Sequence, residues 1–479
     1  MIVIKFGGTS VKDAAAMQHA AKIARSYKVP VAVVLSATAG TTNALLQMVE
    51  LAFPVAVVLS ATAGTTNALL QMVELASAGQ MEQVSGIKKN IESNHMTMIR
   101  ELGLDQDQML KNEVARYFST LEILLIGVYY IREATPRVRD AVAAHGELFS
   151  TRIFAAYLKS LAVDCRWFDV REVMITDESF GGARPDKSQL DRLTGQKLEP
   201  VLDSSGVIVT QGFIGSTGEG LTTTLGRGGS DYTAALLGNA LHAERIEIWT
   251  DVSGVMTADP RLIKSAFSQR DLSFKEAAEL AYFGANVLHP STILPALEKN
   301  IPVLVKNTAV PEDPGTTITL ESKRPGVIKA IAFRKNITVL TVESSRMLLA
   351  YGFLENIFKV FSRHKVSVDL ISTSEITVSL TIDDNYSIDN IVKELSEFSN
   401  VKVTGKTSII SLVGENIKES PGFLHKVFES LDGIPIEMIT FGTSNVNLSV
   451  VIPEHYLNDA VMKLHRNFFE SGGKETNPE

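Results

Sequence analysis

Two stretches of the chain combine a cation with glycines in a way that suits the binding of anions. Lys5 ends an apolar run, and Arg227 stands before a pair of glycines in TLGRGGSDYTAALL. The lysine is followed after Phe6 by Gly7, Gly8, Thr9 and Ser10. Glycines let backbone N–H groups and a helix N-terminus approach phosphate oxygens, and a guanidinium can hold a carboxylate with two parallel hydrogen bonds. The two stretches therefore predict sites for phosphate and carboxylate groups.

A third stretch, AHGELFST, places Glu147 at the start of a predicted helix. A carboxylate there could hold a substrate ammonium group, or could simply interact with the helix dipole. Each cation also has a purely structural interpretation. Lys5 could be a surface lysine beside a tight turn, and Arg227 could face solvent after a glycine turn. Ser230 and Asp231 are predicted to cap a helix that begins near Tyr232. The glycines match neither the Walker nor the dinucleotide motif.

The elements that must position these residues alternate short β-branched runs with helical segments. Such alternation predicts an α/β fold, with a mostly parallel sheet sandwiched by helices, over residues 1–310. One helix is predicted at Val11–Tyr27, with Ser10 and Asp13 spaced as a capping box. The predicted strands are Ile2–Phe6, Val31–Leu35, Val207–Gln211, Arg245–Thr250 and Ile301–Val305. Residues 311–330, rich in Pro, Gly and Thr, are predicted to be a linker.

The C-terminal region contains a weak internal repeat. GFLENIFKVF from Gly352 and GFLHKVFESL from Gly422 share Gly-Phe-Leu, and each lies in a similar order of predicted strands and helices. We therefore expect two ferredoxin-like βαββαβ modules, at 331–405 and 406–479. Two alternatives remain: the two modules are interleaved, or the region consists of two unrelated α+β pieces.

A stronger repeat lies near the N-terminus. PVAVVLSATAGTTNALLQMVELA occurs without a difference at 30–52 and at 54–76. Because one Lys5 and one Arg227 cannot furnish two pockets, we interpret one copy as surplus, from a recent duplication or an artefact of the sequence. Its Val-Ala-Val-Val-Leu run is expected to form an edge strand or to lie exposed. The first copy, with Ser36 and Thr42, is preferred for the site over Ser60 and Thr66.

Composition narrows the class of protein. The 479 residues carry a formal net charge of -8, which argues against nucleic acid as a partner. The one cysteine, Cys165, favours a reducing compartment. No secretory signal is visible, and the most apolar stretch, Ile123–Ile131, is too short to span a bilayer. We therefore expect a cytoplasmic protein without a membrane partner.

Taken together, the motifs resemble the amino acid kinase family, and within it the aspartokinases, over nearly the whole chain. The motifs occur in the family's order, and the C-terminal pair resembles ACT modules of the lysine-sensitive class. The motifs are Lys5-Phe-Gly-Gly-Thr-Ser, Ser-Ala-x-x-Gly-x-Thr-Asn, His145-Gly-Glu, Leu225-Gly-Arg-Gly-Gly-Ser-Asp, Thr250-Asp-Val, Asp259-Pro-Arg and Val287-Leu-His-Pro. The resemblance implies that ATP phosphorylates the side-chain carboxylate of L-aspartate, the first step toward lysine, threonine and methionine.

The resemblance also implies roles for individual residues. Catalysis would rest on Lys5, Gly8 and Arg227. Aspartate would be bound by Ser36, Thr42, Glu147, Arg227 and Ser230. ATP, with Mg²⁺ bridging its phosphates and no protein metal site assigned, would be bound by Lys5, Gly7, Gly8, Thr9, Ser10, Thr250, Asp251, Met256, Arg261 and Asn286. L-lysine as an allosteric inhibitor would be bound by Met347, Gly352, Phe353, Leu354, Val368, Asp369, Ser374 and Glu375, in a homodimer formed through the ACT modules.

Two positions depart from the family pattern. Asn286 stands where the family usually has a lysine near the ATP phosphates, and Met256 where it usually has a tyrosine near the adenosine. Asn286 and the extra repeat copy keep one alternative open, a catalytically weak ACT-containing regulator that binds amino acids. A second alternative is a kinase for another small acid such as glutamate or acetylglutamate. Glu147 argues against acetylglutamate, because an acylated amine carries no charge.

Overall fold

The computed structural model describes residues 2–6, 10, 12–25, 31–35, 55–59, 64–204, 207–284, 290–321, 327–344, 351–383, 388–442 and 444–470. The chain divides into two compact units. Unit 1 comprises Met1–Val255 and Val287–Leu320, and unit 2 comprises Met256–Asn286 and Glu321–Glu479. This division differs from the predicted boundaries, because Ala258 and Ile263 are buried in an apolar core of unit 2.

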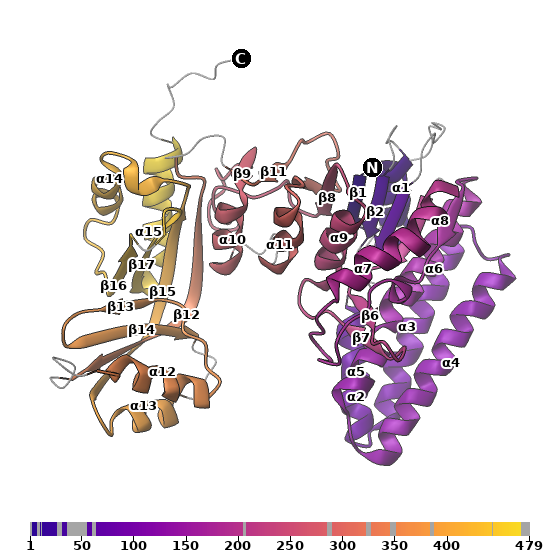
Figure 1. Cartoon of the computed structure of the whole chain (residues 1–479), viewed down its shortest axis with the longest axis horizontal. Coiled ribbons are helices and arrows are strands. Elements are labelled where there is room, and N and C mark those ends of the chain that lie inside the picture. The colour runs from indigo at the N-terminus through magenta and orange to yellow at the C-terminus, as the bar shows by residue number, and fades with distance from the viewer. Residues whose placement is uncertain are drawn as a thin grey trace. The chain divides into compact units, whose positions relative to one another are not determined.

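The main sheet of unit 1 runs in the order β4-β5-β3-β2-β1-β8-β10-β11. Figure 1 shows the neighbouring strands β2, β1 and β8 of this sheet. Neighbouring strands are parallel except for β11, which is antiparallel to β10. The strands are β1 Ile2–Phe6, β2 Val31–Leu35, β3 Val55–Leu59, β4 Cys165–Trp167, β5 Val207–Gln211, β8 Arg245–Thr250, β10 Val303–Asn307 and β11 Thr316–Thr319. The predicted α/β sheet is confirmed. However, β10 lies two residues later than predicted, and the expected linker 311–330 contains β11.

Both faces of this sheet are covered, because all five residues of β1 are buried. Side chains alternate along a strand. Ile4 and Phe6 therefore enter one apolar core, which they share with residues of α1 to α4 and α6, whereas Val3 faces Gly238 of α9. The helices of unit 1 are α1 Ala14–Arg25, α2 Thr65–Ser77, α3 Met81–Glu101, α4 Gln108–Ile131, α5 Pro136–Ala143, α6 His145–Ser160, α7 Lys187–Leu193, α8 Glu199–Ser204, α9 Gly229–Ala240 and α11 Pro290–Glu298.

Two helices of unit 1 differ from their predictions. α1 begins after Asp13, whose carboxylate accepts a hydrogen bond from the Ala16 N–H at 2.8 Å. The predicted capping box at Ser10 is therefore wrong, because the helix starts three residues later. α4 extends well beyond the apolar stretch seen in the sequence, and of the described residues it alone is long and apolar enough for a membrane span. Leu121 and Leu125 of α4 are buried in the unit 1 core, whereas Ile123 and Ile131 of the same helix are exposed.

The two copies of the repeated run form adjacent strands inside the sheet. β2 and β3 pair in parallel so that Val33, Val34 and Leu35 face their own duplicates, Val57, Val58 and Leu59. β1 pairs with β2 through Ile2 and Val3, and with β3 through Ile4 and Lys5. The expectation of a surplus edge strand is therefore wrong. On its other side β3 pairs with β5, and it is the copy that leads into α2.

Unit 2 contains a sheet in the order β13-β14-β12-β15-β17-β16. Its strands are β12 Ala330–Glu343, β13 Ile371–Thr373, β14 Thr377–Asp383, β15 Asn400–Val413, β16 Met438–Phe441 and β17 Asn447–Pro453. The first part of β12 pairs with the last part of β15, and the last part of β12 pairs with the first part of β15. Each long strand therefore serves both modules, which is the interleaved alternative.

The repeated Gly-Phe-Leu begins the first helix of each module. Gly352 has a φ of 81° and Gly422 one of 76°, a left-handed conformation that glycine adopts without steric cost. The helices of unit 2 are α10 Phe274–Tyr282, α12 Phe353–Arg363, α13 Asp389–Leu395, α14 Phe423–Ser430 and α15 Leu457–His465, and a short strand, β9 Asp271–Ser273, precedes α10.

Candidate active site

A pocket of about 280 Å³ in unit 1 brings together residues from five separate parts of the chain. Its lining residues are Lys5, Thr66, Glu147, Phe213, Gly226, Arg227, Gly228, Gly229, Ser230 and Asp231. Both predicted cations therefore lie in one pocket, together with the predicted carboxylate Glu147 and the predicted Ser230. Thr66 comes from the second copy of the repeat, whereas Ser36, Thr42 and Ser60 lie outside the described residues.

Lys5 is directed toward α9 by strand alternation, because its neighbours Ile4 and Phe6 both enter the opposite core. Its Nζ lies 2.5 Å from Oδ1 of Asp231, and the lysine is only 8% exposed. Asp231 lies in the first turn of α9. This acid is a site residue that the sequence analysis missed.

The predicted cap by Ser230 and Asp231 is wrong. The N-cap position of α9 is Gly228, which has a φ of 72° and provides no side-chain hydrogen bond. Asp231 instead supplies a counter-charge for Lys5. The sequence offered no separate signal for this role, because an acid in the first turn of a helix is also favoured by the helix dipole alone.

Arg227 lies on the loop between β7, Thr222–Thr224, and α9. The loop is closely packed at Gly226, where φ is +76° and an added Cβ would lie 3.1 Å from the Gly181 carbonyl oxygen. The Leu225 N–H donates to the Phe213 carbonyl at 2.8 Å. The guanidinium is thus presented on a fixed backbone while its side chain remains exposed.

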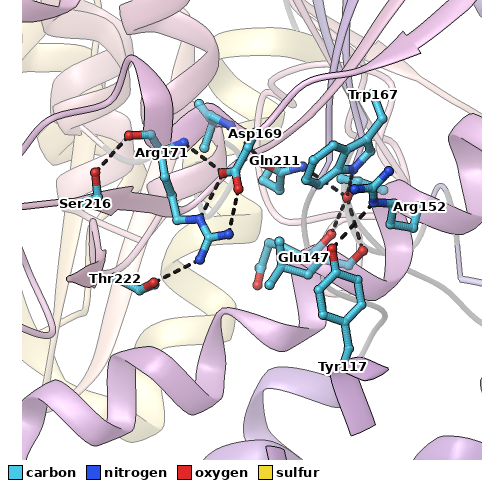
Figure 2. Close-up of polar contacts among 12 residues, drawn as sticks. Tyr117, Glu147, Arg152, Trp167, Asp169, Arg171, Gln211, Ser216 and Thr222 are labelled. Carbon is cyan, nitrogen blue, oxygen red and sulfur yellow. Dashed lines mark hydrogen bonds and ion pairs between the residues drawn. The ribbon is translucent and has the colours of Figure 1, made fainter. Parts of the chain in front are cut away.

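Glu147 lies in the first turn of α6 and is 1% exposed. The turn is fixed by Thr151, whose hydroxyl donates to the Glu147 carbonyl at 2.8 Å. Trp167 Nε1 and Gln211 Nε2 donate to the same hydroxyl oxygen, at 2.9 and 3.2 Å (Figure 2). Burial lowers the pKa of the neighbouring His145, so its imidazole adds no positive charge beside the carboxylate at neutral pH.

The predicted nucleotide-binding residues are only partly described. Ser10 Oγ lies 2.5 Å from Thr308 Oγ1, and Thr250 Oγ1 donates to Asp251 at 3.1 Å, all within unit 1. Met256 and Arg261 belong to unit 2, where Arg261 is ion-paired with Asp259. Gly7, Gly8, Thr9 and Asn286 lie outside the described residues.

Among the predicted effector residues, Asp369 has the most distinctive surroundings. Its Oδ1 accepts hydrogen bonds from Tyr282 Oη at 2.8 Å and from Arg334 Nη1 at 2.7 Å. Its Oδ2 is buried and has no hydrogen-bond partner among the described residues. Ser374 and Glu375 are exposed, and Leu354 is 41% exposed. Phe353 is buried, Val368 is half-buried and Gly352 is exposed. Met347 lies outside the described residues.

Comparison with known proteins finds family matches in both parts of the chain and relatives along nearly its whole length. Residues 1–307 match the amino acid kinase family, and residues 410–468 match an ACT domain. The lysine-sensitive aspartokinase 3 of Escherichia coli is 38% identical over 98% of this chain and 99% of its own length. An aspartokinase of Schizosaccharomyces pombe is 30% identical over 98% of this chain and 93% of its own.

Two crystal structures of the Escherichia coli aspartokinase III resemble this chain along its length. The complex with aspartate and ADP has a TM-score of 0.80 at 37% identity, covering 98% of this chain and 100% of the other. The complex with lysine and aspartate has a TM-score of 0.78 at 38% identity, with the same coverage. The match over residues 1–307 and the full-length likeness to these relatives show that the chain belongs to the amino acid kinase family.

Proposed function

We propose that the chain is an aspartate kinase, which transfers the γ-phosphoryl group of ATP to the side-chain carboxylate of L-aspartate. The observation that carries this proposal is the convergence of Lys5, Glu147 and Arg227 on one pocket. Aspartate presents an ammonium group and two carboxylates, and these three side chains have the complementary charges. The relatives whose names include aspartokinase support the same substrate.

The reaction requires positioning and positive potential more than proton transfer. The side-chain carboxylate of free aspartate has a pKa of about 3.9, so the nucleophile is ionised at neutral pH without a general base. Arg227 would hold the α-carboxylate and Glu147 the α-ammonium, which directs the side chain toward the phosphates. Lys5, held by Asp231, would neutralise the charge that spreads over the transferring phosphoryl group.

ATP would be bound beside Lys5 by Gly7 and Gly8 and by residues near Thr250. A magnesium ion, when bound, would neutralise part of the negative charge of the phosphates. The described residues contain no group of three or more His, Cys, Asp or Glu side chains suited to a metal. Mg²⁺ commonly needs only one or two protein carboxylates, since phosphates and waters supply its other ligands.

The second copy of the repeat would supply the substrate loop. Thr66 lines the pocket, and the strand before it, β3, contacts both β1 and β5. This assignment replaces our sequence-based preference for Ser36 and Thr42. It leaves the first copy as the surplus unit.

Regulation by L-lysine is part of the proposal. The Oδ2 of Asp369, which has no hydrogen-bond partner in the described part of the chain, offers a negative acceptor to an ammonium group. A relative that matches 98% of this chain is named lysine-sensitive. We further propose a cytoplasmic homodimer that associates through the ACT modules. Inhibition by millimolar lysine supports this regulation, whereas inhibition by threonine alone contradicts it.

The decisive experiment is an aspartyl hydroxamate assay on the purified full-length chain with ATP and magnesium. We expect hydroxamate formation with aspartate and none with acetylglutamate or glutamate. Formation with glutamate instead would favour a kinase for another acid. Binding of lysine without any hydroxamate would favour a catalytically weak regulator, the alternative raised by Asn286.

A further inference from the structure

The strand that leads to Arg227 is held by side chains at three consecutive threonines. Thr222 Oγ1 accepts a hydrogen bond from Arg171 Nη1 at 3.0 Å, and Arg171 is itself ion-paired with Asp169 (Figure 2). The Oγ1 atoms of Thr223 and Thr176 lie 2.8 Å apart.

The third threonine is held by a carboxylate. Asp140 of α5 is 3% exposed, and its Oδ1 accepts from the Thr224 hydroxyl at 2.8 Å. Its Oδ2 accepts from the Thr224 N–H at 2.8 Å and from the Gly181 N–H at 2.9 Å. No cation forms an ion pair with Asp140 in the described part of the chain, so neutral donors stabilise the buried group. Burial raises the pKa of Asp140, which these hydrogen bonds oppose.

Asp140 joins the two walls of the pocket without lining it. It lies in α5, which is followed directly by α6 and Glu147. The residues that it holds are Thr224, three positions before Arg227, and Gly181, whose carbonyl lies against Gly226. One carboxylate therefore ties the helix pair that carries Glu147 to the loop that carries Arg227.

We infer that Asp140 is a positioning residue that fixes the spacing between Glu147 and Arg227, and thereby sets the affinity of the pocket for an α-amino acid. The inference rests on the proposed function, in which these two residues hold the α-ammonium and α-carboxylate of aspartate. A small displacement of either group loses a charge-assisted hydrogen bond to the substrate. The binding of ATP depends on other residues and is unaffected.

Two substitutions separate hydrogen-bond acceptance from charge. Asp140→Ala removes every acceptor, whereas Asp140→Asn retains an oxygen for the two N–H groups and an amide that can donate to the Thr224 hydroxyl. We expect Asp140→Ala to raise the KM for aspartate by about tenfold or more and to change the KM for ATP by less than about twofold. In the Asp140→Asn variant the KM for aspartate should stay within about threefold of the value for the original chain.

Asp107→Ala is the matched control, because Asp107 also accepts a backbone N–H, that of Leu110 at 2.9 Å, but caps α4 away from the pocket lining. It should leave both KM values unchanged. Equal rises in the two KM values for Asp140→Ala, or an Asp140→Asn variant as impaired as Asp140→Ala, would overturn the inference. If Asp140→Ala does not fold, Thr224→Val removes the hydroxyl alone; it should raise the KM for aspartate about threefold, and an unchanged KM overturns the inference.

Amide hydrogen exchange gives a readout that does not depend on activity. In Asp140→Ala the amides of residues 222–229 should exchange faster than in the original chain, while those of α4 should not change. Unchanged exchange at 222–229 would reject the role of Asp140 even if aspartate is phosphorylated. Absence of aspartate phosphorylation by the original chain would instead reject the proposed function.

Discussion

Asp231 holds the ammonium group of Lys5 at 2.5 Å, across the gap between the first turn of α9 and the end of β1. The pair fixes the direction of a cation that is otherwise on a flexible four-carbon side chain. It also places a negative charge beside a site for anions. The fixed orientation of Lys5 must therefore favour catalysis by more than the negative charge of Asp231 opposes it. The kinetics of variants at the two residues can measure both effects.

Lys5→Met should lower kcat by about 10²- to 10³-fold, because it removes a preorganised donor to the transferring phosphoryl group. Asp231→Asn should lower kcat by about tenfold, because the ammonium group loses its tether. Lys111→Met is the control: Lys111, on α4, forms a more exposed ion pair with Asp105, and neither residue lines the pocket. Steady-state kinetics with both substrates would contradict this role of Lys5 if only the KM values change.

Thr66→Val should raise the KM for aspartate by about tenfold or more, because it removes a hydroxyl that lines the pocket and can hydrogen-bond a charged group. Thr42→Val makes the same chemical change in the first copy and should have no effect. Deletion of residues 30–53 leaves one complete copy and should retain activity. Loss of aspartate binding in Thr42→Val alone would restore the first copy as the substrate loop.

Asp369→Asn should raise the lysine concentration for half-inhibition by about tenfold or more, because an ammonium group then loses a charged acceptor. Asp383→Asn is the control, since Asp383 binds the same Arg334 but is about one-third exposed. The KM values without lysine should stay unchanged in both variants. Equal loss of inhibition in the two variants would show that Arg334, and not Asp369, is the determinant.

The stability of unit 1 should fall as the pH drops below about 6.5, the ordinary pKa of histidine. His95 is 2% exposed and packs against Phe149 at a ring distance of 5.0 Å, and burial lowers its pKa. The unfolded chain therefore takes up a proton at a pH where the folded unit does not, which favours unfolding in acid. The stability that neutral His95 contributes is fully present above the pKa that His95 has in the unfolded chain, and it is lost as the pH falls below that value.

Urea unfolding between pH 5 and 8 tests this prediction. Both tryptophans, Trp167 and Trp249, lie in unit 1, so their fluorescence follows this unit. His95→Leu should reduce the loss of stability between pH 7 and 5. An identical pH dependence in the variant would exclude His95 as a source of the effect.

The convergence of Lys5, Glu147 and Arg227 on one pocket was implied by the family resemblance of their motifs. Of the three, only Lys5 lies at the carboxyl end of a strand of the main parallel sheet, where ligands of α/β proteins bind. The Gly-Phe-Leu repeat similarly predicted two modules, since each glycine begins a helix with the same left-handed backbone.

Other features depend on contacts that no local pattern encodes. Asp231 was misassigned as a cap because an acid in a first helical turn has the same local signature whether or not a lysine faces it. Identical copies cannot reveal which strand leads into the packed helix, or that both lie inside the sheet. The place of residues 256–286 in unit 2 follows from packing, in which Ala258 and Ile263 share a core with Leu448.

Because each of the two units is built from two segments of the chain, the units are difficult to separate by cutting the backbone. The backbone passes between the units three times, near residues 255, 286 and 320. A single proteolytic nick after residue 320 would therefore release no free C-terminal fragment, because Glu276 still binds the Glu415 N–H and Glu279 still binds Asn447. A truncated chain ending there would instead leave Ala258 and Ile263 exposed to water, and aggregation of the isolated kinase portion is its foreseeable fate.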